Sequence, residues 1–525
     1  MDINNKPTPG VFINEINAFP NSVVEVSTAI PAFIGYTPQA LYEGKSYINV
    51  PAKINSFADF QDIFCLPDYP LSGNPTKQYI PEYYLIQQNN QPVMGDYILI
   101  SDSYYSIVPD PHTIYYLYNC VKLFYENGGG EAYIVSVGSY GPPSKKPMSI
   151  DTQLVNPNVV LDELLEGLQL LVNEPEPTLY ICPEATLLSL EQNATLMKSM
   201  LLQCSQLQTA MSIFDIIGGN NPDPILYTQD IANFRMNTGS IGLNYGMAYY
   251  PFIGTAIIQK QDIDYTNLFG GDVKQLASVI NPASDPNPSI TAIIANIQNP
   301  ASTLTTTQNN NALLNASLDY SYIIKEVERI ANILPASGAI AGVITMTDNQ
   351  EGPWQAPANK SIIGATSLPI KISESQQANL NIDVVSGKSI NAIRIFNELG
   401  ILIWGARTLD GNSQDWKYIP VRRTMIFIEQ SCKLAAQSYI FQPNDKDTWE
   451  AVKLTIGNFL TDVWKQGGLQ GASASDAFSV DCGLGTTMTG EDLLNGYMTI
   501  SIKVAVVHPA EFILITLQQK MESAS

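Results

Sequence analysis

The first two-thirds of the chain alternates short apolar runs with segments of helical periodicity. The run IPAFIGYT at 30–37 is bounded by Pro residues and predicts a buried strand. A helix predicted over 112–130 ends at three glycines, and the alternating segment 131–138 predicts the strand that follows. The alternation continues with helical periodicity at 158–172 and 187–211 and strand signals at 178–184 and 212–218. This order predicts an α/β sheet with helices on its faces.

The last third predicts a different arrangement. Residues 421–440 place apolar side chains on one helical face, and a second helix begins at a cap, Asn444 or Asp445. Two strands are predicted after it, one over 497–507, where apolar and polar residues alternate, and one over 511–517. Two helices against a sheet predict an α+β domain.

The segment 281–320 is rich in Asn, Thr, Ser and Pro and contains NPASDPNPS and STLTTTQNNNALLNAS. These residue types are typical of turns and exposed loops. The composition therefore predicts a loop-rich insertion at 281–320.

Composition narrows the classes of protein that the chain can belong to. Of the 525 residues, 45% are apolar and only 14% are charged, which excludes an intrinsically disordered chain. The net charge of −22 disfavours general binding of nucleic acid, because acidic surfaces repel phosphate. The sequence shows no transmembrane run and no basic, apolar leader, and its six cysteines are widely spaced. We therefore expect reduced thiols in a cytoplasm.

Charge divides unevenly along the chain. Residues 1–365 carry 14 basic and 33 acidic side chains, whereas residues 366–465 carry 11 and 10. Four of the six arginines, Arg394, Arg407, Arg422 and Arg423, fall within these 100 residues. The shift indicates two regions with different surroundings, although chance and ordinary salt bridges explain it equally well.

The search for catalytic or cofactor motifs finds none. SGKS at 386–389 lacks the upstream glycine of a phosphate-binding loop, and the triple glycine at 128–130 closes a helix instead of opening one. The two histidines, His112 and His508, have no partner motif. We expect no enzyme activity, no cofactor and no metal. A cytoplasmic α/β enzyme and a surface-layer or adhesin protein remain as alternatives.

A dozen segments in collinear order resemble the contractile tail-sheath protein family, which occurs in contractile phage tails and in phage-tail-like injection systems. The most specific of them is GILIWGARTL at 400–409 with DWKYIPVRR at 415–423. The others include PTPGVFINEI, STAIPAFIGYT, VKLFYENGGGEAYIVSVGSY, NYGMAYYPF, FQPNDKDTWEAVK and HPAEFILI. Two positions depart from the family pattern: His508 and Glu351 stand where arginine is common.

The resemblance implies a two-domain subunit with arms that add strands to the sheet of a neighbouring subunit. An inner α+β domain would comprise 1–28, as an N-terminal arm and strand, and 366–525, which ends in a C-terminal arm. The outer α/β domain would comprise 29–365. The intersubunit arms would contain Pro9, Gly10, Val11, Phe12, Ile13 and Ile16 at one end, and Glu511, Phe512, Ile513, Leu514, Ile515 and Leu517 at the other.

The resemblance also implies the function. Sheath subunits stack as hexameric rings around an inner tube and contract to drive that tube through a target envelope. The implied partners are other copies of the chain, the inner tube protein, baseplate and terminal cap proteins, and sheath paralogues. Neither nucleic acid nor direct membrane insertion is implied. The particle would be assembled in the bacterial cytoplasm. It would be either an injection system that is released from the cell or the tail of a phage.

The helix predicted over 421–440 begins with two arginines, Arg422 and Arg423, and this basic start suggests a contact with the tube. We predict that Arg422, Arg423 and Lys433 face acidic groups of the tube, while salt bridges inside the sheath are the alternative for the arginines. A structural role is predicted for Trp404, Gly405 and Arg407, with Arg407 as the better candidate for an internal ion pair.

Overall fold

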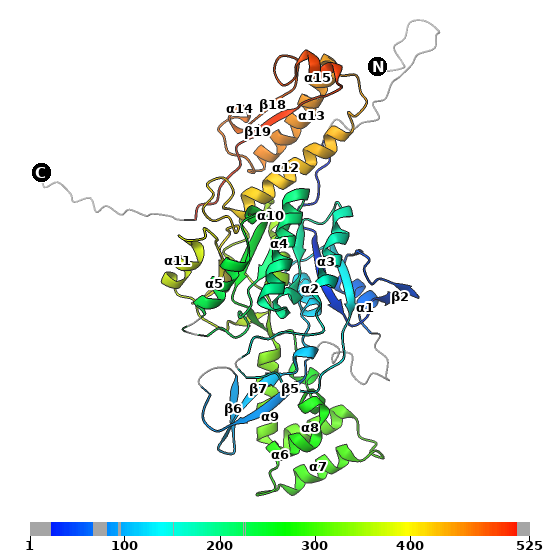
Figure 1. Ribbon diagram of the computed structural model, residues 1–525, viewed down its shortest axis with the longest axis vertical. Coiled ribbons are helices and arrows are strands. Elements are labelled where there is room, and N and C mark those ends of the chain that lie inside the picture. Colours follow the sequence, from blue (N-terminus) through cyan, green and yellow to red (C-terminus); the bar gives the residue numbers. More distant parts are fainter. Residues whose placement is uncertain are drawn as a thin grey trace, which may run out of the picture. The chain divides into compact units, whose positions relative to one another are not determined.

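The computed structural model describes residues 23–66, 81–92, 96–150, 152–223, 225 and 227–511, and these form two compact units (Figure 1). The larger unit comprises Ser27–Ile426 and continues at His508. The smaller unit comprises Phe427–Val507 together with the described residues before Ser27. Predicted arm residues 9–16 and 512–517 lie outside the described residues.

A nine-stranded sheet forms the centre of the larger unit, in the order β14-β17-β16-β11-β10-β9-β1-β8-β4. The six strands from β16 to β8 are parallel, and β17 and β4 pair antiparallel with them. The strands are β1 (Pro31–Thr37), β4 (Ala52–Ile54), β8 (Ala132–Ser139), β9 (Leu179–Ile181), β10 (Met211–Asp215), β11 (Gly246–Tyr250), β14 (Lys360–Ser361), β16 (Asn391–Phe396) and β17 (Gly400–Trp404).

Helices cover both faces of this sheet (Figure 1). On one face, Phe33 of β1 meets Phe124 of α2 (Leu117–Glu126) at 5.6 Å between ring centroids. On the other face lies α3 (Leu161–Leu170), whose Gly167 packs against Ile34 of the same strand. Successive residues of a strand point to opposite faces, so β1 is buried on both sides. The predicted α/β sheet with helices on its faces is confirmed.

Two helices of the larger unit approach each other unusually closely. In α10 (Ser337–Glu351), a side chain at Gly342 would lie 2.5 Å from the carbonyl oxygen of Phe124 in α2, and one at Gly338 would clash with the carbonyl of Cys120. Only glycine permits this distance between helix backbones.

We therefore expect Gly338→Ala to lower the free energy of unfolding by about 1–3 kcal/mol, because backbone atoms would have to move. Gly457→Ala in α13 (Lys446–Lys465) is the control, since no atom of the described residues outside the backbone of that helix lies within 4 Å of the added methyl group. It should stabilise the protein by about 0.5–1 kcal/mol through helix propensity. Urea titrations of both variants measure the difference, and equal effects would contradict the close packing of α2 and α10.

A helical module replaces the loop-rich insertion predicted at 281–320, and that prediction is wrong. Residues of this segment form α7 (Pro288–Gln298) and α8 (Thr306–Ala316), between α6 (Val273–Ile280) and α9 (Leu318–Ala331). Two of the polar residues are helix caps: Asn287 caps α7 with proline at its first turn, and Thr305 makes a capping box at α8. Ile290 and Ile294 bury the inner face of α7.

The larger unit contains further elements outside the nine-stranded sheet. A three-stranded antiparallel sheet contains β5 (Tyr83–Gln88), β7 (Ser103–Pro109) and β6 (Tyr97–Ile100). The others are β2 (Leu41–Tyr42), β3 (Lys45–Ser46), α1 (Phe57–Phe64), α4 (Leu190–Leu207), α5 (Thr228–Asn237), β12 (Ile253–Thr255), β13 (Ile333–Leu334), β15 (Ala365–Ser367) and α11 (Glu374–Asn381).

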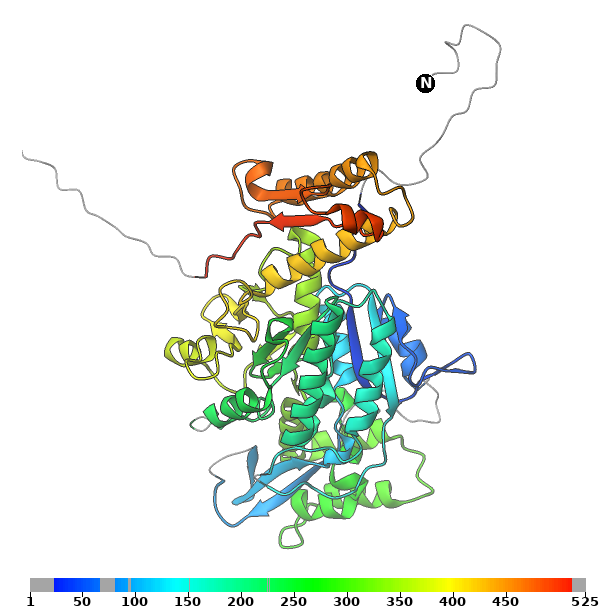
Figure 2. The same ribbon diagram turned by 45° about the horizontal axis from the view of Figure 1, so that its top comes forward.

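The smaller unit places a long helix against two strands (Figure 2). Helix α13 (Lys446–Lys465) begins at the predicted cap Asp445 and buries the stripe Val452, Ile456, Phe459, Leu460 and Val463. The strands are β18 (Phe478–Asp481) and β19 (Ser501–Val504), and the short helices are α14 (Ala474–Ala477) and α15 (Gly490–Leu494). The predicted strand 497–507 is shorter, Ser501–Val504, and before it the carbonyl of Thr499 accepts a hydrogen bond from Thr487 Oγ1.

The boundary between the units differs from the prediction that 366–525 forms one domain. Strand β16 pairs with β11 and with β17, so these residues belong to the large sheet. Helix α12 (Ile419–Gln437) contributes its first part to the larger unit and the part from Phe427 to the smaller one. Strand pairing over more than 100 positions, which no local pattern reports, decides this boundary.

Candidate assembly interface

The smaller unit contains a sheet of only two strands. Strands β18 and β19 pair antiparallel from Phe478 opposite Val504 to Asp481 opposite Ser501. Among the described residues, no third strand joins this sheet. A two-stranded sheet is marginally stable, and its outer edges present N–H and C=O groups that can pair with another strand.

The described residues before Ser27 belong to the smaller unit. The backbone N–H of Val26 donates to Ser431 Oγ of α12 over 3.2 Å, and Val23 is buried. The residues predicted as the N-terminal arm, 9–16, precede this point and lie outside the described residues.

The C-terminal segment is instead held on the larger unit, by the last described residue. Glu511 accepts from Arg407 Nε at 2.9 Å and from Arg407 Nη2 at 2.6 Å, and Tyr418 Oη donates to it over 3.0 Å. The Arg407 side chain is 6% exposed and that of Glu511 is 20% exposed. Charge-assisted, two-pronged contacts of this kind are strong and directional. We call Arg407, Tyr418 and Glu511 the C-terminal clamp.

The WGAR segment positions Arg407. The side chain of Asn391 in β16 is fully buried; it donates to the carbonyl of Arg407 and accepts from its N–H, both at 2.8 Å. A side chain at Gly405 would lie 2.6 Å from Asn391 Oδ1, so glycine is required there. Trp404 packs on Phe396 with ring centroids 4.4 Å apart. These contacts are consistent with the predicted structural role of Trp404, Gly405 and Arg407.

Arg407 has the internal ion pair that the sequence favoured, but its partner was missed. Glu511 was predicted only as an arm residue. The two positions lie 104 residues apart, and no spacing or motif links them.

The placement of Arg422 and Arg423 does not fit a role facing an inner tube. Arg422 is 3% exposed and lies between the rings of Tyr245 and Trp416, at 4.7 and 4.4 Å from their centroids. Arg423 is 5% exposed and pairs with Asp348. Both cations are therefore held inside the larger unit. The salt-bridge alternative, which was predicted for both arginines, is observed for Arg423 with Asp348, whereas Arg422 contacts aromatic rings. Lys433 is exposed, so the tube-facing prediction stays open for Lys433 alone.

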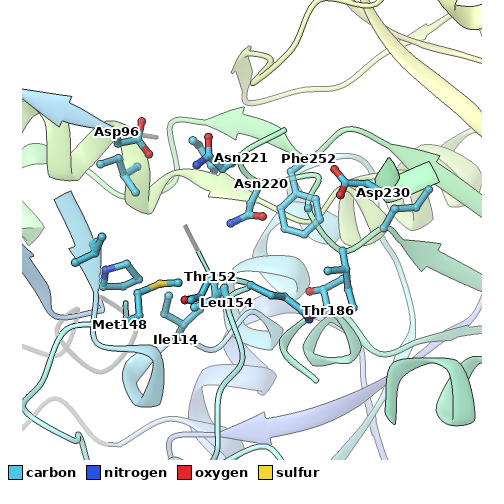
Figure 3. A pocket seen from close by; sticks show the side chains of 18 of the residues that line it. Asp96, Ile114, Met148, Thr152, Leu154, Thr186, Asn220, Asn221, Asp230 and Phe252 are labelled. Atoms are coloured by element: carbon cyan, nitrogen blue, oxygen red, sulfur yellow. The ribbon is translucent and has the colours of Figure 1, made fainter. Parts of the chain in front are cut away.

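A separate pocket of about 770 Å³ lies in the larger unit between the end of β10 and the β5–β7 sheet. Figure 3 shows Asn220 and Phe252 between the carboxylates of Asp96 and Asp230, which therefore do not converge. Burial raises the pKa of Asp230 to about 6, and Asp223 adds to the shift. No histidine, cysteine, lysine or arginine is among the described residues that line this pocket.

Three further observations concern metal ligands, membrane spans and cysteines in the described residues. Nowhere in the part of the chain that the structure describes do three His, Cys, Asp or Glu side chains gather as metal ligands would. None of the helices described combines the length and the apolar character that a bilayer span requires. All six cysteines are buried and unpaired by disulfides.

Solved structures define the class of protein that has this fold. The sheath complex of an extracellular contractile injection system, PVC, in its contracted state is 23% identical with a TM-score of 0.58, over 98% of this chain and 99% of that one. The contracted helical sheath of the anti-feeding prophage is 24% identical with a TM-score of 0.56, over 98% of this chain and all of the other. The chain thus has the fold of contractile sheath subunits over nearly its whole length.

Sequence comparisons support the same family. Residues 412–520 match the phage tail sheath C-terminal domain family. The tail sheath protein of Vibrio phage KVP40 is 27% identical over 139 residues, which cover 26% of this chain and 20% of that protein. The putative prophage major tail sheath protein of Pseudomonas aeruginosa strain UCBPP-PA14 is 31% identical over 142 residues, 25% of this chain and 34% of that protein.

The aligned regions therefore span only a fifth to a third of the curated relatives. Together with the shared fold, they confirm the resemblance to the contractile tail-sheath family, and residues 412–520 match the model of its C-terminal domain.

Proposed function

We propose that this chain is the sheath subunit of a contractile injection particle and that it polymerises as stacked hexameric rings around an inner tube. The observation that carries the proposal is the two-stranded β18–β19 sheet, whose outer edges no described strand covers. Arms from neighbouring copies would add strands to these edges, as in other cases of β-augmentation. The apolar, β-prone segments 9–16 and 512–517 are the candidate donors.

The roots of the two arms support a mechanical role. The N-terminal segment leaves from the smaller unit at Val26, whereas the C-terminal segment leaves from the larger unit at Glu511. A subunit with this arrangement would be linked to its neighbours through both units. Main-chain pairing at the ends of arms tolerates movement of whole units, so linked subunits could change from a long, narrow packing to a short, wide one.

The particle and its partners follow from the proposal. The subunit would contact copies of itself, the inner tube, a baseplate and a terminal cap, and it would act in a phage-derived injection system or in a phage tail. Lys433, exposed on the part of α12 in the smaller unit, is the remaining candidate for contact with acidic groups of the tube. A mechanical role needs no nucleotide or metal. The pocket, with its separated carboxylates, does not favour the alternative of an α/β enzyme.

Electron microscopy of the purified chain, alone and with its tube protein, tests the proposal. Hollow tubes with sixfold symmetry are the expected result, and Lys433→Glu should lower the fraction assembled on the tube. Lys465→Glu, an exposed lysine of α13, is the matched control for the change of charge. Compact single particles in both wild-type samples would contradict the proposal.

The clamp gives a sharper version of this experiment. We expect Glu511→Gln to reduce polymerisation severalfold, because the substitution leaves the buried charge of Arg407 without a counterion and weakens the root of the arm. Circular dichroism of the monomer should be unchanged. Glu131→Gln, which removes an exposed partner of Lys53, should polymerise like the wild type. If Glu511→Gln polymerised as the wild type does, the C-terminal clamp would not be needed to hold the arm for assembly.

A further inference from the structure

The loop that follows α11 exposes three apolar side chains. Ile382, Val384 and Val385 are 53%, 89% and 95% exposed, and we call these three residues the apolar loop. Single exposed apolar residues are ordinary on protein surfaces, but three within four positions indicate a contact site.

The backbone of the apolar loop is held in place. Asp383 accepts from the N–H of Ser386 at 2.8 Å and from that of Val385 at 3.3 Å, and its own carbonyl accepts from Gly387 over 3.0 Å. Arg235 Nε lies 3.7 Å from the Asp383 carboxylate. The two valines therefore cannot turn inward without the loss of these contacts, so their exposure is part of the folded structure.

The apolar loop begins beside the C-terminal clamp. Arg407, whose Nε and Nη2 hold Glu511, also donates through Nη1 to the carbonyl of Asn381 over 3.0 Å. Groups bound to one guanidinium lie within about 6 Å of each other. The chain beyond Glu511 therefore starts next to the residue that precedes Ile382.

One polar atom near this point lacks a partner. Asn381 Oδ1 is buried and accepts no hydrogen bond among the described residues. Buried acceptors are nearly always satisfied, and the backbone N–H of an added extended segment is a suitable donor. This observation is independent of the exposed valines and points to the same place.

We infer that, in the unassembled subunit, the apolar loop binds the chain's own C-terminal segment 512–517. That segment carries Phe512, Ile513, Leu514, Ile515 and Leu517. Six extended residues reach about 20 Å, and Val384 and Val385 lie within four residues of Asn381, at most about 14 Å away. The C-terminal clamp fixes where the segment 512–517 begins, and the apolar loop provides the surface that the segment contacts. Docking removes apolar side chains from contact with water.

The docked segment is withheld from neighbouring subunits. The withholding of the segment rests on the proposed function, because it assumes that 512–517 adds a strand to a neighbouring subunit. The docking of 512–517 on the apolar loop does not need that assumption. Substitution of the two valines should then shorten the lag before polymerisation.

Disulfide trapping in the monomer tests the docking directly. The native cysteines are all buried, so cysteines introduced as Val385→Cys and Ile515→Cys can be oxidised selectively. We expect an intramolecular cross-link at least about tenfold faster than in the control pair Leu318→Cys and Ile515→Cys, because a disulfide needs Cα atoms within about 7 Å. Leu318 is 90% exposed and lies at the start of α9.

Hydrogen exchange gives a second measurement without a cysteine or a change in the arm. Amides of 512–517 should exchange at least about tenfold faster in the double variant Val384→Ser, Val385→Ser than in the wild type, since the full burial of even one valine changes the docking equilibrium about tenfold. Equal cross-linking in the two cysteine pairs, or unchanged exchange, would overturn the inference. Cross-linked dimers would also overturn it and would assign the apolar loop to a second copy. Both measurements use the monomer, so they remain decisive even if the chain never polymerises.

Discussion

Replacing Asp348 with alanine should lower the free energy of unfolding by about 3–5 kcal/mol, because the change leaves a buried cation without its counterion. Asp348 of α10 accepts from Arg423 Nη1 at 2.7 Å and from Nη2 at 2.5 Å. The side chains are 1% and 4% exposed, and Arg423 also donates to the carbonyl of Thr28 over 2.8 Å. Denaturant titration monitored by circular dichroism measures the loss.

Two controls separate burial from charge. Glu450→Ala breaks the pair with Lys453, in which the glutamate is 60% exposed, and should cost less than about 1 kcal/mol. Arg423→Met combined with Asp348→Leu removes both charges and should recover most of the stability that Asp348→Ala loses. A loss below 1 kcal/mol for Asp348→Ala would mean that water reaches the pair.

The second large effect is a pH dependence of stability that comes from Glu184. This side chain follows β9 in the chain and is fully buried. Its Oε1 accepts from the N–H groups of Tyr116 and Leu117 at the start of α2, at 3.2 and 2.8 Å. Its Oε2 is buried without a hydrogen-bond partner, beside Gly35 of β1. Burial outweighs these hydrogen bonds and raises the pKa of Glu184 to about 7, from 4.5.

The raised pKa sets the direction of the effect. The folded state binds the proton more tightly than the unfolded chain, so the stability that Glu184 contributes is present below pH 4.5 and is lost as the pH rises to about 7. Glu184→Gln mimics the protonated form and lacks this loss. Between pH 4.5 and 7.5, its stability relative to the wild type should therefore rise by about 3 kcal/mol.

A neighbouring carboxylate provides the matched comparison. Asp215 at the end of β10 accepts from the N–H groups of Ala336 and Ser337 at the start of α10, at 2.8 and 3.1 Å. Burial raises the pKa of Asp215 to about 6, from 3.8. Asp215→Asn should show a similar rise in relative stability, but completed at lower pH. A pH-independent difference between wild type and Glu184→Gln would contradict the assignment.

The local pattern of apolar residues predicted the strands of the large sheet that helices cover on both faces. Central parallel strands such as β1 and β8 are continuous apolar runs, because helices cover them on each side. The same reasoning failed at 281–320, where Asn and Thr were interpreted as loop residues although Asn287 and Thr305 cap helices. The isoleucines of α7, spaced three and four residues apart, were the signal that could have corrected this prediction.

Burial of charge was the property that sequence reasoning could not reach. Arg422 and Arg423 follow a helix start and look like surface cations, but their helix passes beside Tyr245, Trp416 and Asp348, which come from distant parts of the chain. The same holds for Glu511, whose pairing with Arg407 is visible only in three dimensions.

By itself, the sequence determined the alternation of helices and strands, the acidic and basic division of the chain and the family resemblance, because periodicity, composition and ordered motifs are local properties. The tertiary structure alone decided which unit holds residues 391–404, where each terminal segment is rooted and which arginines are buried. These outcomes depend on strand pairing and on the desolvation of charges between residues far apart in the chain. Neither produces a recognisable pattern in the local sequence around those residues.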